Sequence, residues 1–498
     1  MIFRCSFPIT ACAALVVGTF AILHSPRCAI AEDKSVLTFH GDEKRSGHFV
    51  IPGLSWEKAR SLRLDRTFSA AVAGHLYAQP LYWHPSGSES RMLFVATEND
   101  VVQAFDATTG KELWNRKIGR PVLREALQCG NINPLGVTGT PAIDLATQAI
   151  YLDAAVELPN GPRHQIYGFS LKDGTVLPGW PVDVADALQG SGHHFDPSIQ
   201  NQRAALAILD DKVFVAFGGH FGDCGNYHGW VIGISLHDPH KIVSFETHAR
   251  GGGIWSPGGL SVAGHELFFA TGNTMGAQTW SDGEAVFRLG TELRRSESKE
   301  DYFAPSDWKR LDDRDADLGG SNPLPVDIPG QPLILALGKD RKAYLIDQKD
   351  LGGIGGQLIV KTVSEEPIIT SPATYPVGND VFVAFQSRGT DCPRPGEGKG
   401  LTVLKITGGS PRSMTTAWCG ALDGRGSAVA TTTNGHSDPI VWVVGADGDS
   451  RLHAFRGDTG EPIFASEPLE GLRRFQPLIA TEDSLYVGAD GNIYKFKF

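Results

Sequence analysis

The sequence lacks the signatures of several common enzyme classes. Its 498 residues contain no Walker or dinucleotide-binding glycine motif that leads into a helix, and no G-x-S-x-G element, which argues against those nucleotide-binding folds and against an α/β-hydrolase nucleophile. No C-x-x-C-H motif is present, so an attached c-type haem is not expected. Methionine is rare, with 4 residues, whereas glycine reaches 59 and proline 30. Short apolar runs between glycine- and proline-rich turns indicate an all-β protein.

The first 31 residues are predicted to be an export signal. Arg4 precedes an apolar run at residues 9–23 that is short for a membrane span, and residues 29–31 (AIA) have the form of a cleavage site. An uncleaved anchor is the alternative. We expect a mature chain of residues 32–498 that is periplasmic or secreted, with no stable membrane insertion after cleavage.

The net charge of the chain makes some classes of binding partner unfavourable. The formal net charge is −11, and removal of Arg4 and Arg27 with the signal makes it −13. An acidic surface of this kind disfavours nucleic acid and anionic membranes as partners. It does not identify the partner that the protein has.

Four cysteines remain in the mature chain: Cys129, Cys224, Cys392 and Cys419. In an oxidising compartment they allow two disulfides and three connectivities. Cys392 and Cys419 fall within one sequence repeat, so our first hypothesis pairs them and joins Cys129 to Cys224 across neighbouring repeats. The other connectivities stay open.

A phrase of small residues, usually broken by proline, returns eight times at spacings of roughly 47 to 65 residues. One repeat cannot bury both faces of its small sheet, so the repeats must stack around an axis. We therefore predict an eight-bladed β-propeller of four-stranded blades. The phrases begin at Gln79, Thr140, Ala204, Ser256, Asn322, Ser371, Val429 and Gln476.

The last repeat is incomplete. Residues 484–488 and 492–498 supply middle strands, but the chain ends before an outer strand, while residues 61–68 form a strand without a hairpin partner. Pairing residues 62–67 with 494–497 closes the ring through the N- and C-terminal strands and hides both edges. Seven blades with a flap are the alternative.

Residues 106–114 (DATTGKELW) resemble the outer-strand signature of the pyrroloquinoline-quinone (PQQ)-like repeat. Aspartate and threonine satisfy turn backbone groups, Gly110 supplies a positive φ, and Trp114 is expected to dock on the next blade. The resemblance extends over essentially the whole mature chain. It implies the fold but not the chemistry, because catalytic and structural members share the repeat.

Two central motifs resemble those of the quinoprotein alcohol dehydrogenases, namely residues 251–255 (GGGIW) followed by 271–273 (TGN). In that family the tryptophan stacks under PQQ and the asparagine binds a metal ion. The resemblance thus implies that Trp255 binds the cofactor and that Asn273 is a ligand of Ca²⁺ or another metal ion. A planar cofactor suits an aromatic floor, and an amide oxygen suits a hard cation. Ordinary packing of Trp255 between blades is the alternative.

The acidic segment 312–319 occupies the place of the family's acidic motif. That match implies that Asp315 is the catalytic base and Asp317 a possible metal ligand, since a base must reach the proton of the alcohol. A solvated acidic loop is the alternative.

Three basic residues are candidates for the cofactor's carboxylates. Lys339 and Arg341 lie in a segment that resembles the family's basic hairpin, and Arg203 precedes the third inner strand. PQQ carries three carboxylates, which cationic side chains bind well. Ordinary surface charges are the alternative.

The segment after the predicted strand 213–217 departs from the family. Catalytic members place a glutamate ligand there, whereas this chain has none. Either the cation site is lost, or Asp223 compensates, or His220, Asp223 and His228 form another metal site. The family's disulfide between adjacent cysteines is also missing, and the segment between the glycines and the tryptophan is one residue shorter.

These features leave three hypotheses. The first is an exported quinoprotein-type oxidoreductase that acts on an alcohol or similar small substrate and passes electrons to a separate acceptor. The second is a non-catalytic scaffold that binds a protein, peptide or glycan in the cell envelope, and the third is a metal-binding propeller. Convergence on one axial pocket favours the first, and the residues concerned are His220, Trp255, Asn273, Asp315 and Lys339.

Overall fold

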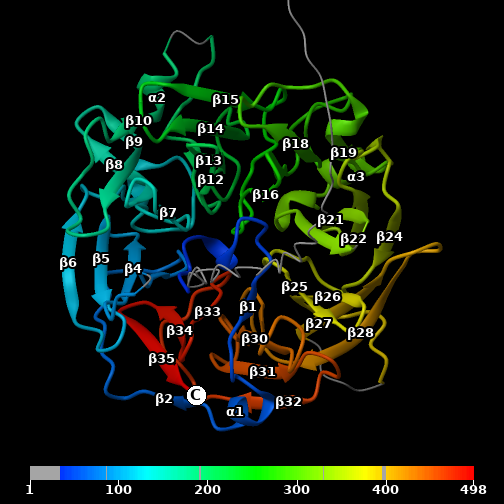
Figure 1. The fold of residues 1–498 in the computed structure, drawn as a ribbon. Coiled ribbons are helices and arrows are strands. Elements are labelled where there is room, and N and C mark those ends of the chain that lie inside the picture. Colours follow the sequence, from blue (N-terminus) through cyan, green and yellow to red (C-terminus); the bar gives the residue numbers. More distant parts are fainter. Residues whose placement is uncertain (1–33, 86, 190–191, 329, 395–399) are drawn as a thin grey trace, which may run out of the picture.

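Eight sheets stand in a ring around a central axis (Figure 1), which confirms the predicted eight-bladed propeller. The computed structural model describes residues 34–85, 87–189, 192–328, 330–394 and 400–498. The predicted signal and its cleavage site lie outside these ranges. Within them, helices are short, and none has the length and apolar character needed to cross a membrane.

Each blade is a four-stranded antiparallel sheet whose first strand lies nearest the axis. From the axis outward, blades 1 to 4 contain β3 (Leu81–Trp83), β4 (Met92–Thr97), β5 (Val101–Asp106) and β6 (Glu112–Lys117); β7 (Ala142–Asp144), β8 (Ala149–Leu158), β9 (Gly161–Ser170) and β10 (Val182–Asp183); β12 (Ala207–Leu209), β13 (Lys212–Gly219), β14 (Trp230–Ser235) and β15 (Ile242–Glu246); β16 (Ser261–Ala263), β17 (Glu266–Ala270), β18 (Val286–Gly290) and β19 (Tyr302–Ala304).

Blades 5 to 8 repeat this order. They contain β20 (Leu324–Ile328), β21 (Gln331–Leu337), β22 (Lys342–Asp347) and β24 (Ile359–Thr362); β25 (Ala373–Val377), β26 (Asp380–Ser387), β27 (Gly400–Thr407) and β28 (Ser413–Ala421); β29 (Val429–Thr432), β30 (Ile440–Val444), β31 (Leu452–Arg456) and β32 (Pro462–Ala465); β33 (Ile479–Ala480), β34 (Ser484–Ala489), β35 (Asn492–Lys497) and β2 (Arg63–Leu64).

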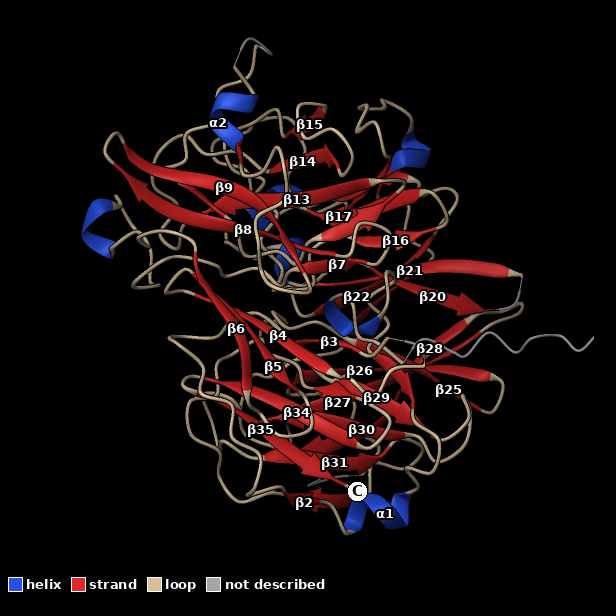
Figure 2. Cartoon of the chain, turned by 60° about the vertical axis from the view of Figure 1, so that its left-hand side comes forward, coloured by secondary structure: helices blue, strands red, loops and turns tan. Residues whose placement is uncertain are grey.

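The remaining elements extend or connect the blades. The short strands β1 (His48–Val50), β11 (Gln200–Asn201) and β23 (Gly353–Ile354) lengthen blades 7, 3 and 4. The helical turn η1 (Phe39–Gly41) precedes β1. The others lie in connections between strands (Figure 2): α1 (Trp56–Arg60), α2 (Val184–Ala187), α3 (Trp308–Asp312), η2 (Arg124–Ala126), η3 (Lys299–Asp301) and η4 (Leu318–Gly320).

The ring is closed by strands from the two ends of the chain, as predicted. β2 pairs antiparallel with β35, and Leu64 lies opposite the buried Phe496. The pairing is shorter than the predicted 62–67, because after Asp65 the chain turns, with the amide of Thr67 donating to Asp65 Oδ1 at 3.0 Å. An ion pair between Lys497 Nζ and Asp65 Oδ2 at 2.6 Å fastens the end of the ladder.

Neighbouring blades are joined by tryptophans of the outer strands. The indole N–H of Trp114 donates to the carbonyl of Leu171 in the next blade at 3.1 Å, which confirms the expected docking. Trp418 makes the equivalent bond to Gly457 at 2.8 Å. In blades 3, 4 and 8 the small-residue phrases lead into the inner strands and are not strands themselves, because β12, β16 and β33 start only after the phrases end.

Both disulfides of the first hypothesis are present. Cys129 is bonded to Cys224, and Cys392 to Cys419. Two disulfides are typical of proteins that fold in an oxidising compartment.

The N-terminal segment 38–47, here called the axial segment, crosses the centre of the ring (Figure 1), which the sequence analysis did not predict. Arg45 is fully buried and donates to the carbonyls of Leu206 (2.7 Å) and Leu260 (2.8 Å), which belong to two neighbouring blades. The amide of His40 donates to Gln79 Oε1 at 2.9 Å, and β1 continues in parallel beside β29. The axial segment therefore contacts blades on several sides of the ring.

We expect Arg45→Met to lower the free energy of unfolding by about 3 kcal/mol, because the methionine cannot donate to the three buried carbonyls that Arg45 bonds, those of Phe39, Leu206 and Leu260. Chemical denaturation measures this loss. Arg60→Met is the control, since Arg60 forms an exposed ion pair with Glu461, and such pairs contribute about 0.5 kcal/mol. Equal effects of the two substitutions would contradict the role given to the axial segment.

Candidate functional site

A cavity of about 560 Å³ lies at the axis, at the ends of the inner strands by which the chain enters each blade. Five residues that were predicted to share one axial pocket line this cavity: His220, Trp255, Asn273, Asp315 and Lys339. Arg203, Asp223 and Asp317 line it as well.

The two glycine-containing motifs form one hydrogen-bonded unit on the wall of this cavity. The amide of Gly252 donates to the carbonyl of Asn273 (2.8 Å), and the amide of Gly272 donates to that of Gly253 (2.9 Å). A Cβ built on Gly272 would lie 3.2 Å from Trp255 Nε1 and as close to Asp317. Glycine is therefore needed for the close approach of Trp255 to the TGN motif.

Asp317 connects the predicted residues to one another. It is buried, its Oδ2 accepts from Trp255 Nε1 at 3.1 Å, and its Oδ1 accepts from the amide of Asn273 at 2.9 Å. Asp315 precedes it at a φ of +50°. Lys339 Nζ lies 2.6 Å from Asp315 Oδ1 and 2.7 Å from Asp317 Oδ2. The lysine thus bridges the two carboxylates, and it lies 5.1 Å from the Trp255 ring centroid.

The charged groups of Lys339, Asp315 and Asp317 change the pKa values of Lys339 and Asp315. Burial tends to lower the pKa of Lys339, but the attraction of Asp317 and Asp315 outweighs burial and raises it. Although the Asp315 side chain is largely exposed, partial burial of its carboxyl, followed by repulsion from Asp317, raises the pKa of Asp315 in spite of its ion pair with Lys339. A lysine with a raised pKa stays charged at neutral pH, while the Asp315 carboxyl becomes more basic than usual.

Glu284 is a further acidic residue next to Asp317, and it was not among the predicted site residues. It is fully buried, its Oε2 accepts from the amide of Leu318 at 2.6 Å, and its Oε1 has no hydrogen-bond partner among the described residues. Burial and the charge of Asp317 raise the pKa of Glu284 well above its usual value. Only the fold brings Glu284 here, since nothing in its sequence surroundings signals the contact.

Another part of the cavity lining is basic. The Arg203 guanidinium carbon lies 6.0 Å from the Trp255 ring centroid and 5.9 Å from that of Phe475. Among the described residues Arg203 forms no hydrogen bond or ion pair, whereas the nearby Arg473 is paired with Asp490. A cation that faces a cavity without an anionic partner favours an anionic ligand.

Other predicted site residues lie apart from this group. Arg341 is exposed on the hairpin and does not line the cavity. The Nδ1 of His228 lies 2.8 Å from the carbonyl of Thr247, and His228 does not line the cavity either. Asp223 accepts from the Tyr227 hydroxyl at 2.7 Å.

The structure does not join the predicted metal ligands into a site. His220 is buried, and burial lowers its pKa to about 4, so its imidazole is neutral. In the part of the chain that the structure describes, no group of three His, Cys, Asp or Glu side chains is arranged to hold a metal ion. The metal-ligand assignments of His220, Asp223, His228, Asn273 and Asp317 therefore stay predictions.

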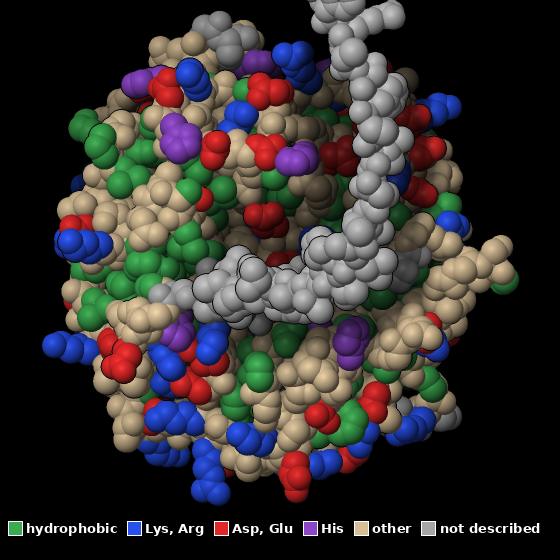
Figure 3. Space-filling model, viewed as in Figure 1, with side chains coloured by type: hydrophobic (Ala, Val, Ile, Leu, Met, Phe, Trp, Pro, Cys, Tyr) green, Lys and Arg blue, Asp and Glu red, His purple; other side chains and the backbone are tan. Residues whose placement is uncertain are grey.

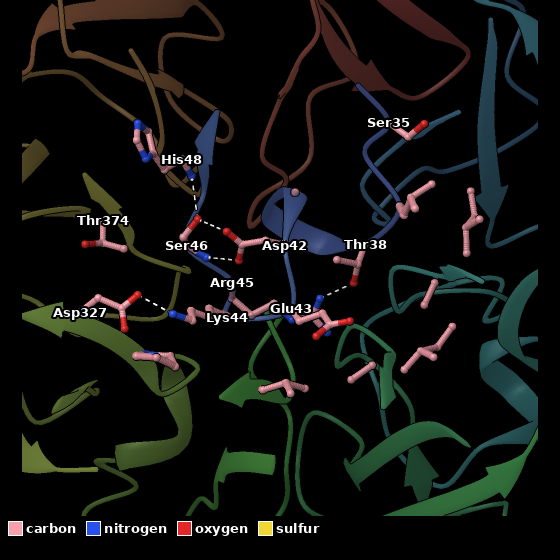
Figure 4. A pocket seen from close by; sticks show the side chains of 18 of the residues that line it. Ser35, Thr38, Asp42, Glu43, Lys44, Arg45, Ser46, His48, Asp327 and Thr374 are labelled. Atoms are coloured by element: carbon pink, nitrogen blue, oxygen red, sulfur yellow. Dashed lines mark hydrogen bonds and ion pairs between the residues drawn. The ribbon is translucent and has the colours of Figure 1, made fainter. Parts of the chain in front are cut away.

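A second cavity, of about 950 Å³, opens at the other ends of the inner strands, beside the axial segment. Figure 3 views this face, and acidic side chains are visible in the hollow near its centre. The polar groups mostly pair with one another (Figure 4): Asp42 accepts from the amide of Ser46 at 2.9 Å, and Lys44 pairs with Asp327. None of the predicted site residues lines this cavity.

Among solved structures, the fold of the chain is similar to that of alcohol and methanol dehydrogenases. The chain matches the quinohemoprotein alcohol dehydrogenase ADHIIG of Pseudomonas putida HK5 with a TM-score of 0.65 at 14% identity, over 93% of this chain and 80% of that chain. A europium-containing methanol dehydrogenase matches with a TM-score of 0.64 at 13% identity, over 94% and 99% of the two chains. BamB from Moraxella catarrhalis matches with a TM-score of 0.50 at 14% identity, over 88% and 100%.

No protein-family model and no curated protein matches the sequence. At identities this low, the structural likeness shows a shared fold, the quinoprotein-like propeller, and leaves the chemistry to be argued from the cavity.

We expect Lys339→Met to lower the free energy of unfolding by about 2 kcal/mol, because it leaves the buried Asp317 carboxylate beside Asp315 without its cation. Arg341→Met, on the same hairpin but outside the cavity, is the matched control and should leave stability unchanged. Urea titration of both variants at neutral pH gives the comparison. A Lys339 variant as stable as the control would show that the bridge between the carboxylates does not stabilise the fold.

Proposed function

We propose that the protein is an exported, periplasmic or secreted, quinoprotein-type oxidoreductase that binds PQQ in the 560 Å³ cavity and oxidises an alcohol or a similar small substrate. The observation that carries this proposal is the convergence of five separately predicted residues on one axial cavity. A scaffold has no need of that convergence, since its binding surface is formed by loops on the rim.

The residues of the cavity fit PQQ, which is planar and carries three carboxylates. The Trp255 indole provides an aromatic surface beside two cations, Lys339 and Arg203. Because Arg203 has no partner among the described residues, a ligand carboxylate satisfies it without breaking an existing ion pair. Trp255 would hold the ring system, and the two cations would hold the carboxylates.

The residues do not fit a calcium ion in the same way. Ca²⁺ takes six to eight oxygen ligands, whereas Asn273 and Asp317 are the two oxygen-donor ligands that match the family here. The Asp317 oxygens already accept from Trp255 and Asn273, and the ammonium group of Lys339 bridges Asp317 and Asp315. The positive charge beside the carboxylates is therefore supplied by Lys339, and we assign no step to a metal ion.

When bound, PQQ supplies a two-electron oxidant for the substrate. The chain provides the base: Asp315 Oδ1 is held by Lys339, which leaves Oδ2 to accept the proton of the substrate hydroxyl. Asp317 keeps Trp255 and Asn273 in register with that base. Reoxidation requires a separate electron acceptor, which is part of the proposal.

PQQ binding tests the proposal directly. We expect Trp255→Ala to raise the dissociation constant of PQQ by about tenfold, because the substitution removes the stacking surface. Trp56→Ala is the control, since Trp56 is also half-buried under a cation, Arg456 at 3.6 Å, but does not line the cavity. Absorbance titration and calorimetry measure the affinities. Failure of the unaltered protein to bind PQQ would refute the proposal, and equal affinity of the Trp255 variant would refute the stacking role.

The metal requirement gives an independent prediction. We expect PQQ to bind with the same affinity, within about twofold, in EDTA and in millimolar Ca²⁺, because Lys339 already supplies the local positive charge. The titration is repeated with Lys339→Met, whose affinity should be weaker in both buffers. Binding that occurs only with Ca²⁺ would show that the ligand assembles a metal site around Asn273 and Asp317.

A further inference from the structure

Two loops that are far apart in the sequence form one wall of the cavity. Asn131 and Ile132 come from the loop after η2, and His220 and Asp223 come from the loop after β13. The Cys129–Cys224 disulfide joins these loops across 95 residues of sequence. It is a covalent link within the wall of the cavity.

The surroundings of this link hold the first loop in place. The amide of Cys224 donates to Cys129 Sγ at 3.3 Å, and a Cβ built on Gly222 would lie 3.4 Å from Cys129 Cβ. The side chain of Arg124 donates to the carbonyl of Gly130 at 2.8 Å. The chain on either side of the link is therefore packed against it.

The second loop is bonded in turn to the segment that carries Trp255. The Arg250 side chain donates to the carbonyl of Asp223 at 2.8 Å, and the amide of Gly251 donates to that of Tyr227, also at 2.8 Å. Gly251 begins the glycine segment that ends in Trp255. A displacement of the loop would thus act on the backbone that positions the indole.

The second disulfide has different surroundings. Cys419 lies in the outer strand β28, and Cys392 follows β26 in the same blade, 27 residues away in sequence. Gly389 packs against both sulfur atoms, and none of these three residues lines the cavity. The chain therefore contains an internal control for the first disulfide.

We propose that the Cys129–Cys224 disulfide is a positioning element of the ligand site, and that it holds the two wall loops in the arrangement that binds the ligand. The inference rests on the proposed function for the identity of the ligand. Without the link, the two loops gain conformations that binding must remove, and the cost of ordering them weakens affinity. The Cys392–Cys419 disulfide contributes to stability without this effect.

The test compares Cys129→Ala/Cys224→Ala with Cys392→Ala/Cys419→Ala. In the first variant we expect amide exchange in residues 124–135 and 219–229 to accelerate about tenfold, and PQQ to bind about tenfold more weakly. In the second variant both quantities should match the unaltered protein. Hydrogen exchange with mass spectrometry and the PQQ titration provide the readouts.

A second measurement covers the case in which the first variant does not fold. In Cys392→Ala/Cys419→Ala only Cys129–Cys224 remains, and a phosphine reductant converts it to two thiols in the folded protein, itself becoming the phosphine oxide. The same faster exchange and weaker binding are expected. Unchanged exchange after the link is cut overturns the inference, as does an equal change in both variants. If the unaltered protein does not bind PQQ, the proposed function fails, and the exchange of the two loops alone decides the inference.

Discussion

The pairing of β2 with β35 is the constraint on which the remaining structure depends. Each blade is stable only against its two neighbours, so a ring that is open at one point has two unsatisfied edges and no fixed diameter. The residues of the cavity come from several blades, and Arg203, Trp255 and Lys339 approach one another only because the circumference is fixed. A short antiparallel contact with one ion pair thus determines distances at the axis, far from the contact itself.

Opposite charges share one small volume at that axis. Two carboxylates and one ammonium group together carry a net charge of −1, while Arg203 keeps a positive charge without a partner among the described residues. The Asp317 carboxylate accepts hydrogen bonds from Trp255 and Asn273, so it holds these two residues in position. Under the proposed function one acid positions other residues and the other is the base, and their burial differs accordingly: Asp317 is enclosed, whereas the Asp315 side chain is 64% exposed.

Much of this arrangement is readable from the sequence, for identifiable reasons. The middle strands of all eight blades are short apolar runs joined by turn residues, and the blade count predicted from the repeats is correct. The cavity residues Trp255 and Asn273 lie in local motifs, and both disulfides agree with the first of the pairings that the repeat boundaries allowed. The axial segment was not predicted, because residues 38–47 belong to no repeat and gain their contacts from blades that are distant in sequence. Glu284 and the preference for Lys339 over Arg341 likewise depend on tertiary approach.

The axial segment has a consequence for traffic through the molecule. Between the two cavities lies a void of only about 10 Å³, lined by Phe39 of the axial segment together with Tyr77 and Arg203. A propeller with an open central channel admits small molecules from either end, whereas in this protein the axial segment blocks the channel at the end where it crosses the ring. Under the proposed function, a molecule that binds beside Trp255 would therefore enter and leave through the opening of the 560 Å³ cavity, and substrate and product would use that opening in turn.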